Sequence, residues 1–205
     1  MSNAHPVADL PYLLPLGAVA YHEAGHAVMA RLIGRLLVMI TYTKGPPHLA
    51  PADYEGSTNW GEDQYFRAWN RHVPYDRLGL VMDRDIPEGV ALVHAAGNAA
   101  QEIWCQKNQV GNQQVTWGKR DGQLLKRELQ DIFNNLNAAQ QAQKTQEIKD
   151  WAERILSDPF CWQTVEVVVR ASLEGLTMTP DEFVLGDVYD RIEQAFATFG
   201  EPHED

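Results

Sequence analysis

The spacing of apolar residues along the chain predicts two strong helices. The first is expected over residues 16–33, where side chains at intervals of three and four residues form one face: Val19, His22, His26, Met29 and Ile33. Gly34 follows directly and is a residue type that ends helices. The second is expected over residues 87–107, with an apolar face made of Leu92, Val93, Ala96, Ala99, Ala100 and Ile103.

Four further helical segments are expected after the second helix. Asp121 is expected to be the N-cap of a helix whose apolar face continues to residue 136. Another helix is expected over residues 145–156, and Asp158 followed by Pro159 predicts the start of one that reaches residue 173. Residues 179–182 repeat this kind of cap signature and predict a C-terminal helical region that extends to residue 199.

Strands are expected in one part of the chain. Residues 36–42 contain Val, Ile, Thr and Tyr, which favour a strand, and residues 55–60 form a candidate return strand. Residues 61–86 follow no clear period. The predicted fold class is therefore mainly α, with a small two-stranded β element.

Length and charge restrict the function classes. The 205 residues predict one domain over residues 16–205, after a tag remnant and N-terminal arm over residues 1–15. The net charge of −11 argues against binding to nucleic acids and to anionic membranes. The sequence lacks a run of about 18 apolar residues, so no membrane-spanning segment is predicted. Two cysteines, Cys105 and Cys161, fit a reducing compartment, so a soluble cytoplasmic protein is expected.

Candidate chemistry lies in the first helix, where residues 22–26 have the pattern H-E-x-x-H. Residues four apart share a helix face, so His22 and His26 can bind one zinc ion through their ring nitrogens. Glu23 lies one position further along, where its carboxylate can reach a zinc-activated water and accept its proton. The pattern therefore predicts a zinc peptidase with Glu23 as the general base.

A catalytic zinc site of this kind needs a third protein ligand, and the residues alone leave three candidates. Glu102 lies among small residues of the second helix, where it could bind the metal or accept a hydrogen bond from a ligand histidine. Asp121 stands at a helix start, where a carboxylate is also favoured as an N-cap. His94 lies on the second helix, where a histidine without a metal is the simpler interpretation.

These motifs resemble the peptidase domain of FtsH-type ATP-dependent zinc proteases. That family carries H-E-A-G-H-A, which residues 22–27 match in full. A later family helix has a pattern like G-G-R-A-A-E-E-(I/L), and residues 96–103 match most of it, with Asn98 and Gln101 as departures. A third family segment, T-G-A-x-(N/D)-D-L, is matched loosely by residues 116–121, with Asp121 at its last aspartate.

The resemblance implies a helical zinc-peptidase domain with the β element near the active site. It implies that His22, His26 and Asp121 bind zinc, that Glu23 is the base, and that Glu102 orients a zinc-bound histidine. It also implies polypeptide substrates and ring-shaped oligomers. The sequence contains no G-x-x-x-x-G-K-(S/T) phosphate loop, so an ATPase would be supplied by a partner in trans or by a segment outside this sequence.

Two function hypotheses follow. The first is a zinc-dependent metalloendopeptidase that hydrolyses unfolded proteins or peptides. Its substrate access is expected to differ from the family, because the bulky residues Trp117, Lys119 and Arg120 replace small or polar ones. The second is a non-catalytic metal-binding scaffold of the same fold that binds a protein partner. Glu23 favours the enzyme, since a binding module needs no base at that position.

Overall fold

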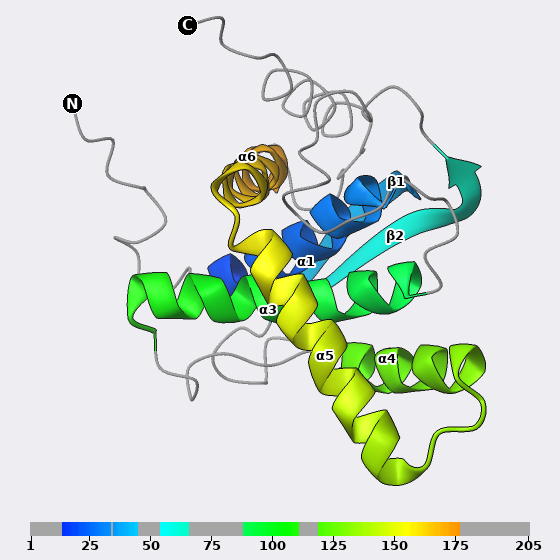
Figure 1. Cartoon of the computed structure of the whole chain (residues 1–205). Coiled ribbons are helices and arrows are strands. Elements are labelled where there is room, and N and C mark those ends of the chain that lie inside the picture. Colours follow the sequence, from blue (N-terminus) through cyan, green and yellow to red (C-terminus); the bar gives the residue numbers. More distant parts are fainter. Residues whose placement is uncertain (1–13, 34, 45–53, 66–87, 111–118, 177–205) are drawn as a thin grey trace, which may run out of the picture.

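The computed structural model describes residues 14–33, 35–44, 54–65, 88–110 and 119–176. Within these ranges the chain is mainly α, as the apolar pattern predicts, and it contains a two-stranded sheet. Figure 1 shows the elements in chain order: α1 (Leu14–Leu32), β1 (Arg35–Lys44), β2 (Tyr54–Tyr65), α3 (Gly89–Asn108), α4 (Lys119–Ile132), α5 (Ala138–Leu156) and α6 (Pro159–Leu176).

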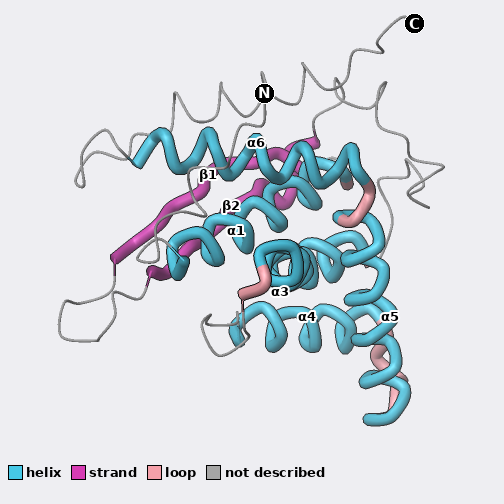
Figure 2. The backbone as a smooth tube through the Cα atoms, turned by 90° about the vertical axis from the view of Figure 1, so that its left-hand side faces the viewer, coloured by secondary structure: helices cyan, strands magenta, loops and turns pink. Residues whose placement is uncertain are grey.

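Helix α1 lies at the centre of the described structure. It packs against α3, α6 and both strands, and Figure 2 shows it between α6 on one side and α3 on the other, with α4 beyond α3. Val28, Met29 and Ala30 have no exposed surface. A helix covered on several sides can carry apolar residues around most of its circumference, which is why small and apolar residues are so frequent in α1.

Small residues allow α1 and α3 to approach closely. A β-carbon at Gly25 would lie 2.5 Å from the backbone oxygen of Ala96 and 2.6 Å from the β-carbon of Ala100. No larger residue fits these distances without a shift of the α3 backbone, so the crossing requires glycine at this position. The crossing places the H-E-x-x-H motif of α1 directly against α3.

Strands β1 and β2 form the antiparallel pair expected from the sequence, and both are longer than predicted. The register pairs Ile40 with Thr58 and Tyr42 with Gly56. Strand β2 also packs on α1. Because side chains alternate along a strand, Gly56 and Thr58 lie on the same face of β2.

Two helix starts differ from the prediction. Helix α4 begins at Lys119, so Asp121 lies inside its first turn and is not its N-cap. Helix α5 begins at Ala138, seven residues before the expected start. The cause is a capping box: the Asn137 side chain accepts the backbone N–H of Gln140, and the Gln140 side chain accepts that of Asn137.

Other boundaries agree more closely with the prediction. Helix α1 begins at Leu14, two residues before the expected start, and α6 begins at Pro159 as expected. Helix α4 ends at Ile132, before the expected end at residue 136. Most of the expected N-terminal arm and the helical region over residues 179–199 lie outside the described residues. None of the helices that the structure describes is long and apolar enough to cross a membrane.

Candidate metal centre

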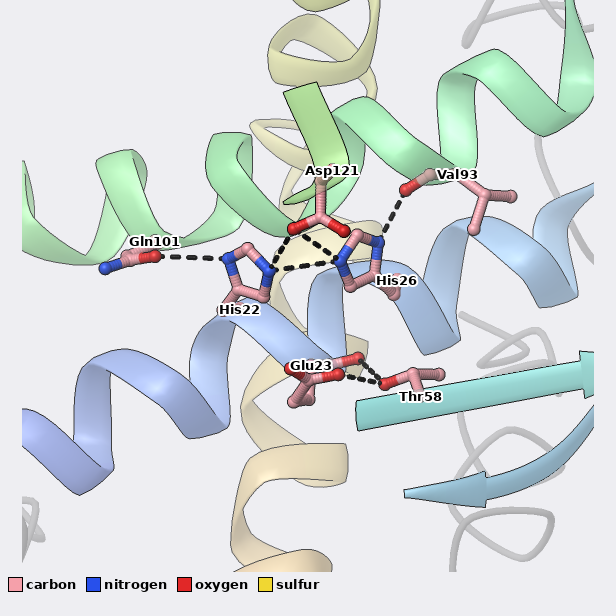
Figure 3. A network of polar contacts seen from close by, with 7 residues as sticks. All are labelled: His22, Glu23, His26, Thr58, Val93, Gln101 and Asp121. Carbon is pink, nitrogen blue, oxygen red and sulfur yellow. Dashed lines mark hydrogen bonds and ion pairs between the residues drawn. The ribbon is translucent and has the colours of Figure 1, made fainter. Parts of the chain in front are cut away.

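Three polar side chains of the H-E-x-x-H motif in helix α1 are buried in the interior of the protein. His22, Glu23 and His26 are 7%, 4% and 4% exposed, which is unusual for such residues unless they have partners. The two imidazole rings lie edge to face, with 4.7 Å between their centroids and 3.1 Å between their Nε2 atoms (Figure 3). The four-residue spacing on one helix face accounts for this proximity.

Asp121 reaches the two histidines from the first turn of α4. Its Oδ2 atom lies 2.9 Å from His22 Nε2 and 3.6 Å from His26 Nε2. Ligand atoms of a tetrahedral zinc ion, each about 2.0–2.1 Å from the metal, lie roughly 3.3 Å apart. The three separations in this group bracket that value, so His22, His26 and Asp121 form a possible metal-binding triad.

The other ring nitrogen of each histidine is fixed by a carbonyl group of α3. His22 Nδ1 donates to Gln101 Oε1 at 3.1 Å, and His26 Nδ1 donates to the backbone oxygen of Val93 at 2.6 Å. A histidine that donates from Nδ1 in its neutral form keeps its lone pair on Nε2. Both Nε2 lone pairs are thereby directed at the Asp121 carboxylate, an arrangement that suits a cation between them.

Charge in the triad favours the ionised carboxylate. Burial opposes ionisation of Asp121, but the close approach of the His22 and His26 rings outweighs burial and holds the pKa of Asp121 well below its usual range. Burial likewise opposes protonation of His26, and Asp121 and Glu23 outweigh it, so the pKa of His26 is raised above 6.5. Both shifts favour a protonated His26 imidazole beside an ionised Asp121 carboxylate when no metal ion is bound.

Gly97 of α3 forms a wall of this site. A β-carbon there would meet the Nε2 atoms of both His26 and His22. These are the atoms that face the centre of the triad, so a side chain at position 97 would occupy the place of a metal ion. The small-residue stretch of α3 thus serves the site as well as the helix crossing.

Glu23 is directed away from the triad and toward the sheet (Figure 3). The Thr58 hydroxyl of β2 donates to Glu23 Oε2 at 2.6 Å. Glu23 is therefore buried between α1 and β2, beside the triad but not part of it.

The structure brings together four of the residues singled out in the sequence, His22, Glu23, His26 and Asp121, and leaves Glu102 out. The Glu102 side chain is exposed, and its charged neighbours are Glu153 and Lys149 of α5. Its expected role, orienting a zinc-bound histidine, is taken by the preceding residue, Gln101. Neighbouring helix residues differ by about 100° in direction, so a shift of one position moves the side chain out of the site.

His94, the third candidate ligand, does not belong to the triad. It is buried on α3, and burial together with the charge of His26 lowers its pKa to about 4. His94 is therefore neutral near pH 7. Its place in the structure is that of a buried helix histidine outside the triad.

Variants of Gln101 and Glu102 test which of these two residues orients His22 by a hydrogen bond. Gln101→Met keeps the side-chain length but removes the carbonyl that accepts the His22 N–H, so we expect a loss of zinc affinity of about 10–100-fold. Glu102→Gln should leave the affinity within about twofold, because this side chain is exposed and lies outside the site. Competition titrations with a zinc-binding dye measure both affinities. A larger loss of zinc affinity in Glu102→Gln than in Gln101→Met would show that Glu102, and not Gln101, supports the metal site.

Zinc affinity should depend on pH in a defined direction. Because the pKa of His26 is raised, zinc must displace a proton from His26 at pH values where an ordinary histidine has already lost it. We expect the affinity to fall by about tenfold per pH unit below that raised pKa. In the metal-free protein, protonated His26 stabilises the fold below its unfolded-state pKa of 6.5, and this contribution disappears as the pH rises through the folded pKa. An affinity that does not change between about pH 6 and pH 8 would contradict this prediction.

Comparison with known proteins gave no match. No protein-family model matches the chain, no curated protein matches it, and no solved structure matches it. Any functional conclusion therefore depends on the site itself and on the motif resemblance.

Proposed function

We propose that this chain is a zinc-dependent peptidase in which His22, His26 and Asp121 hold the metal. The observation that carries the proposal is the pair of Nδ1 hydrogen bonds to α3, which leaves both Nε2 lone pairs facing the Asp121 carboxylate. Two imidazoles and one carboxylate are a ligand set typical of catalytic zinc, with one position open.

The residues around the metal have separate roles in the proposed reaction. Zinc, when bound, supplies a Lewis acid that polarises a carbonyl group and makes water more acidic. Glu23 accepts a proton from the attacking water and returns it to the leaving amine. Gln101 and Val93 keep the two histidines in the Nδ1–H form, which holds their rings in place for the metal.

The family resemblance extends the proposal to the substrate and to partners. It favours peptide bonds of unfolded proteins or peptides as the substrate, ring-shaped oligomers, and an ATPase as a partner. The sparse cysteines favour a cytoplasmic location. Ferrous iron is the competing metal, because two histidines and one carboxylate also suit this ion. Glu23 favours hydrolysis, since a buried carboxylate beside the ligands is what a peptidase needs as a base.

Metal analysis and a digestion assay test the proposal together. We expect protein purified without chelator to contain one zinc ion per chain and to cleave casein. A chelator should stop the cleavage and added zinc should restore it, while His26→Ala should lose both the metal and the activity. Iron in place of zinc would contradict the metal assignment. Bound zinc without cleavage of any unfolded protein would favour the non-catalytic metal-binding scaffold.

A further inference from the structure

Strand β2 contacts the proposed base directly, although it supplies none of the metal ligands. The Thr58 hydroxyl lies 2.6 Å from Glu23 Oε2 and 3.1 Å from the Glu23 backbone oxygen (Figure 3). A hydroxyl has a single proton, and the charged acceptor at the shorter distance takes it. This contact fixes one of the two carboxylate oxygens of Glu23.

Gly56 completes the contact from the same face of β2. A β-carbon at position 56 would collide with the Cγ and Oε1 atoms of Glu23. The Glu23 side chain thus lies directly over the backbone of the strand, and the absence of a side chain at Gly56 gives it room. Gly56 and Thr58 together restrict where the carboxylate can be.

We infer that Thr58 is the positioning residue of the general base, and that it gives the two oxygens of Glu23 different tasks. Oε2 accepts the Thr58 hydrogen bond, and Oε1 accepts the proton of the attacking water. The Thr58 hydroxyl keeps its own proton throughout, so it takes no part in the transfer. This inference rests on the proposed function, because it assigns a role within the same site.

Positioning of this kind acts on the rate and not on substrate binding. A glutamate has three rotatable side-chain bonds, and a displaced base loses much of its effect on the reaction even when the metal is intact. Residues that hydrogen-bond to the groups acting at a metal site typically contribute about 10–100-fold to activity. Removal of the Thr58 hydroxyl should therefore lower kcat and leave KM unchanged.

Three variants of β2 test the inference in the full chain. Thr58→Val keeps the shape but loses the donor, and we expect kcat for casein-derived peptides to fall by about 10–100-fold at unchanged KM and zinc content. Thr58→Ser keeps a hydroxyl and should recover most of the activity. Ser57→Ala removes the preceding hydroxyl, which is exposed and points to the opposite face of the strand, and should behave like the wild type.

Several results would overturn the inference. One is a Thr58→Val enzyme with wild-type kcat, and another is a Thr58→Ser enzyme as impaired as Thr58→Val, which would indicate packing rather than hydrogen bonding. Loss of zinc from Thr58→Val would make the residue part of the metal site instead. Raised KM with unchanged kcat would make it a substrate contact.

Stability measurements separate this inference from the proposed function. Urea unfolding is measured for four metal-free proteins: the wild type, Thr58→Val, Glu23→Ala and the double variant. We expect Thr58→Val to lower the urea midpoint when Glu23 is present and to have little effect when it is absent. If Thr58→Val shifts the urea midpoint equally in the wild type and in Glu23→Ala, Thr58 and Glu23 are not coupled and the inference fails. If the wild type cleaves nothing, the proposed function fails, and this coupling still decides whether Thr58 holds Glu23.

Discussion

Replacement of Glu23 by glutamine is expected to reduce peptidase activity by at least about 100-fold while zinc remains bound. Glutamine has the same size, and its amide oxygen can still accept the hydrogen bond from Thr58. Glutamine at position 23 cannot accept the proton of the attacking water, so hydrolysis should be lost while the metal-binding triad stays intact. The measurement is kcat/KM on an unfolded substrate, together with the zinc content of the same sample.

The metal content serves as the control for this variant. His22, His26 and Asp121 form the triad without Glu23, so unchanged zinc affinity shows that the ligands are intact. A Glu23→Gln enzyme with near-wild-type activity would remove Glu23 from the mechanism. Loss of zinc would indicate that Glu23 supports the ligands and would leave its role as a base without support.

Gly97→Ala is expected to abolish zinc binding almost completely. The new methyl group would meet the Nε2 atoms of His22 and His26, so both rings would have to move away from Asp121. The ring movement would also break the hydrogen bonds made by their Nδ1 atoms. We expect the zinc affinity to fall by more than about 100-fold, and overpacking to cost about 1–3 kcal/mol of stability. Zinc competition and urea unfolding measure the two effects.

Gly122→Ala is the matched control for this substitution. Gly122 follows Asp121 in helix α4, and a β-carbon there would have no atom within 4 Å. Alanine favours a helix over glycine by about 0.8–1.0 kcal/mol, so this variant should be slightly more stable and bind zinc normally. Wild-type zinc affinity in Gly97→Ala would show that the metal does not lie against α3 as the triad implies.

The pairing of His22 and His26 could be predicted from the sequence because its geometry is local. His22 and His26 are one helical turn apart, and one turn of any helix brings them together. Gln101 was missed because its role depends on how α3 is rotated against α1. A signal was present: Val93, Gly97 and Gln101 recur every four residues, and the structure places all three against the histidines. Glu102 was predicted instead because it lies among the same small residues of α3 and carries a carboxylate.

Asp121 illustrates a different difficulty. Its position near a helix start was predicted, but an N-cap and a first-turn residue direct their side chains differently, and only the folded chain decides between them. Helix α5 shows the same problem at its start, because Ala138 and the following glutamines form no apolar period. Their helical propensity and the Asn137 cap are sufficient there, since most of this segment is exposed and needs no buried face.

The route by which Asp121 reaches the triad has a consequence for the dynamics of the molecule. His22 and Asp121 are 99 residues apart in the sequence, so an ion held by both would act as a removable cross-link between α1 and α4. Local opening of α4 would then have to break a metal–ligand bond as well as the packing of the helix. Amide hydrogen exchange in α4 would then slow when metal is bound. Metal supply would thus govern how long α4 resists cellular proteases, separately from any reaction at the site.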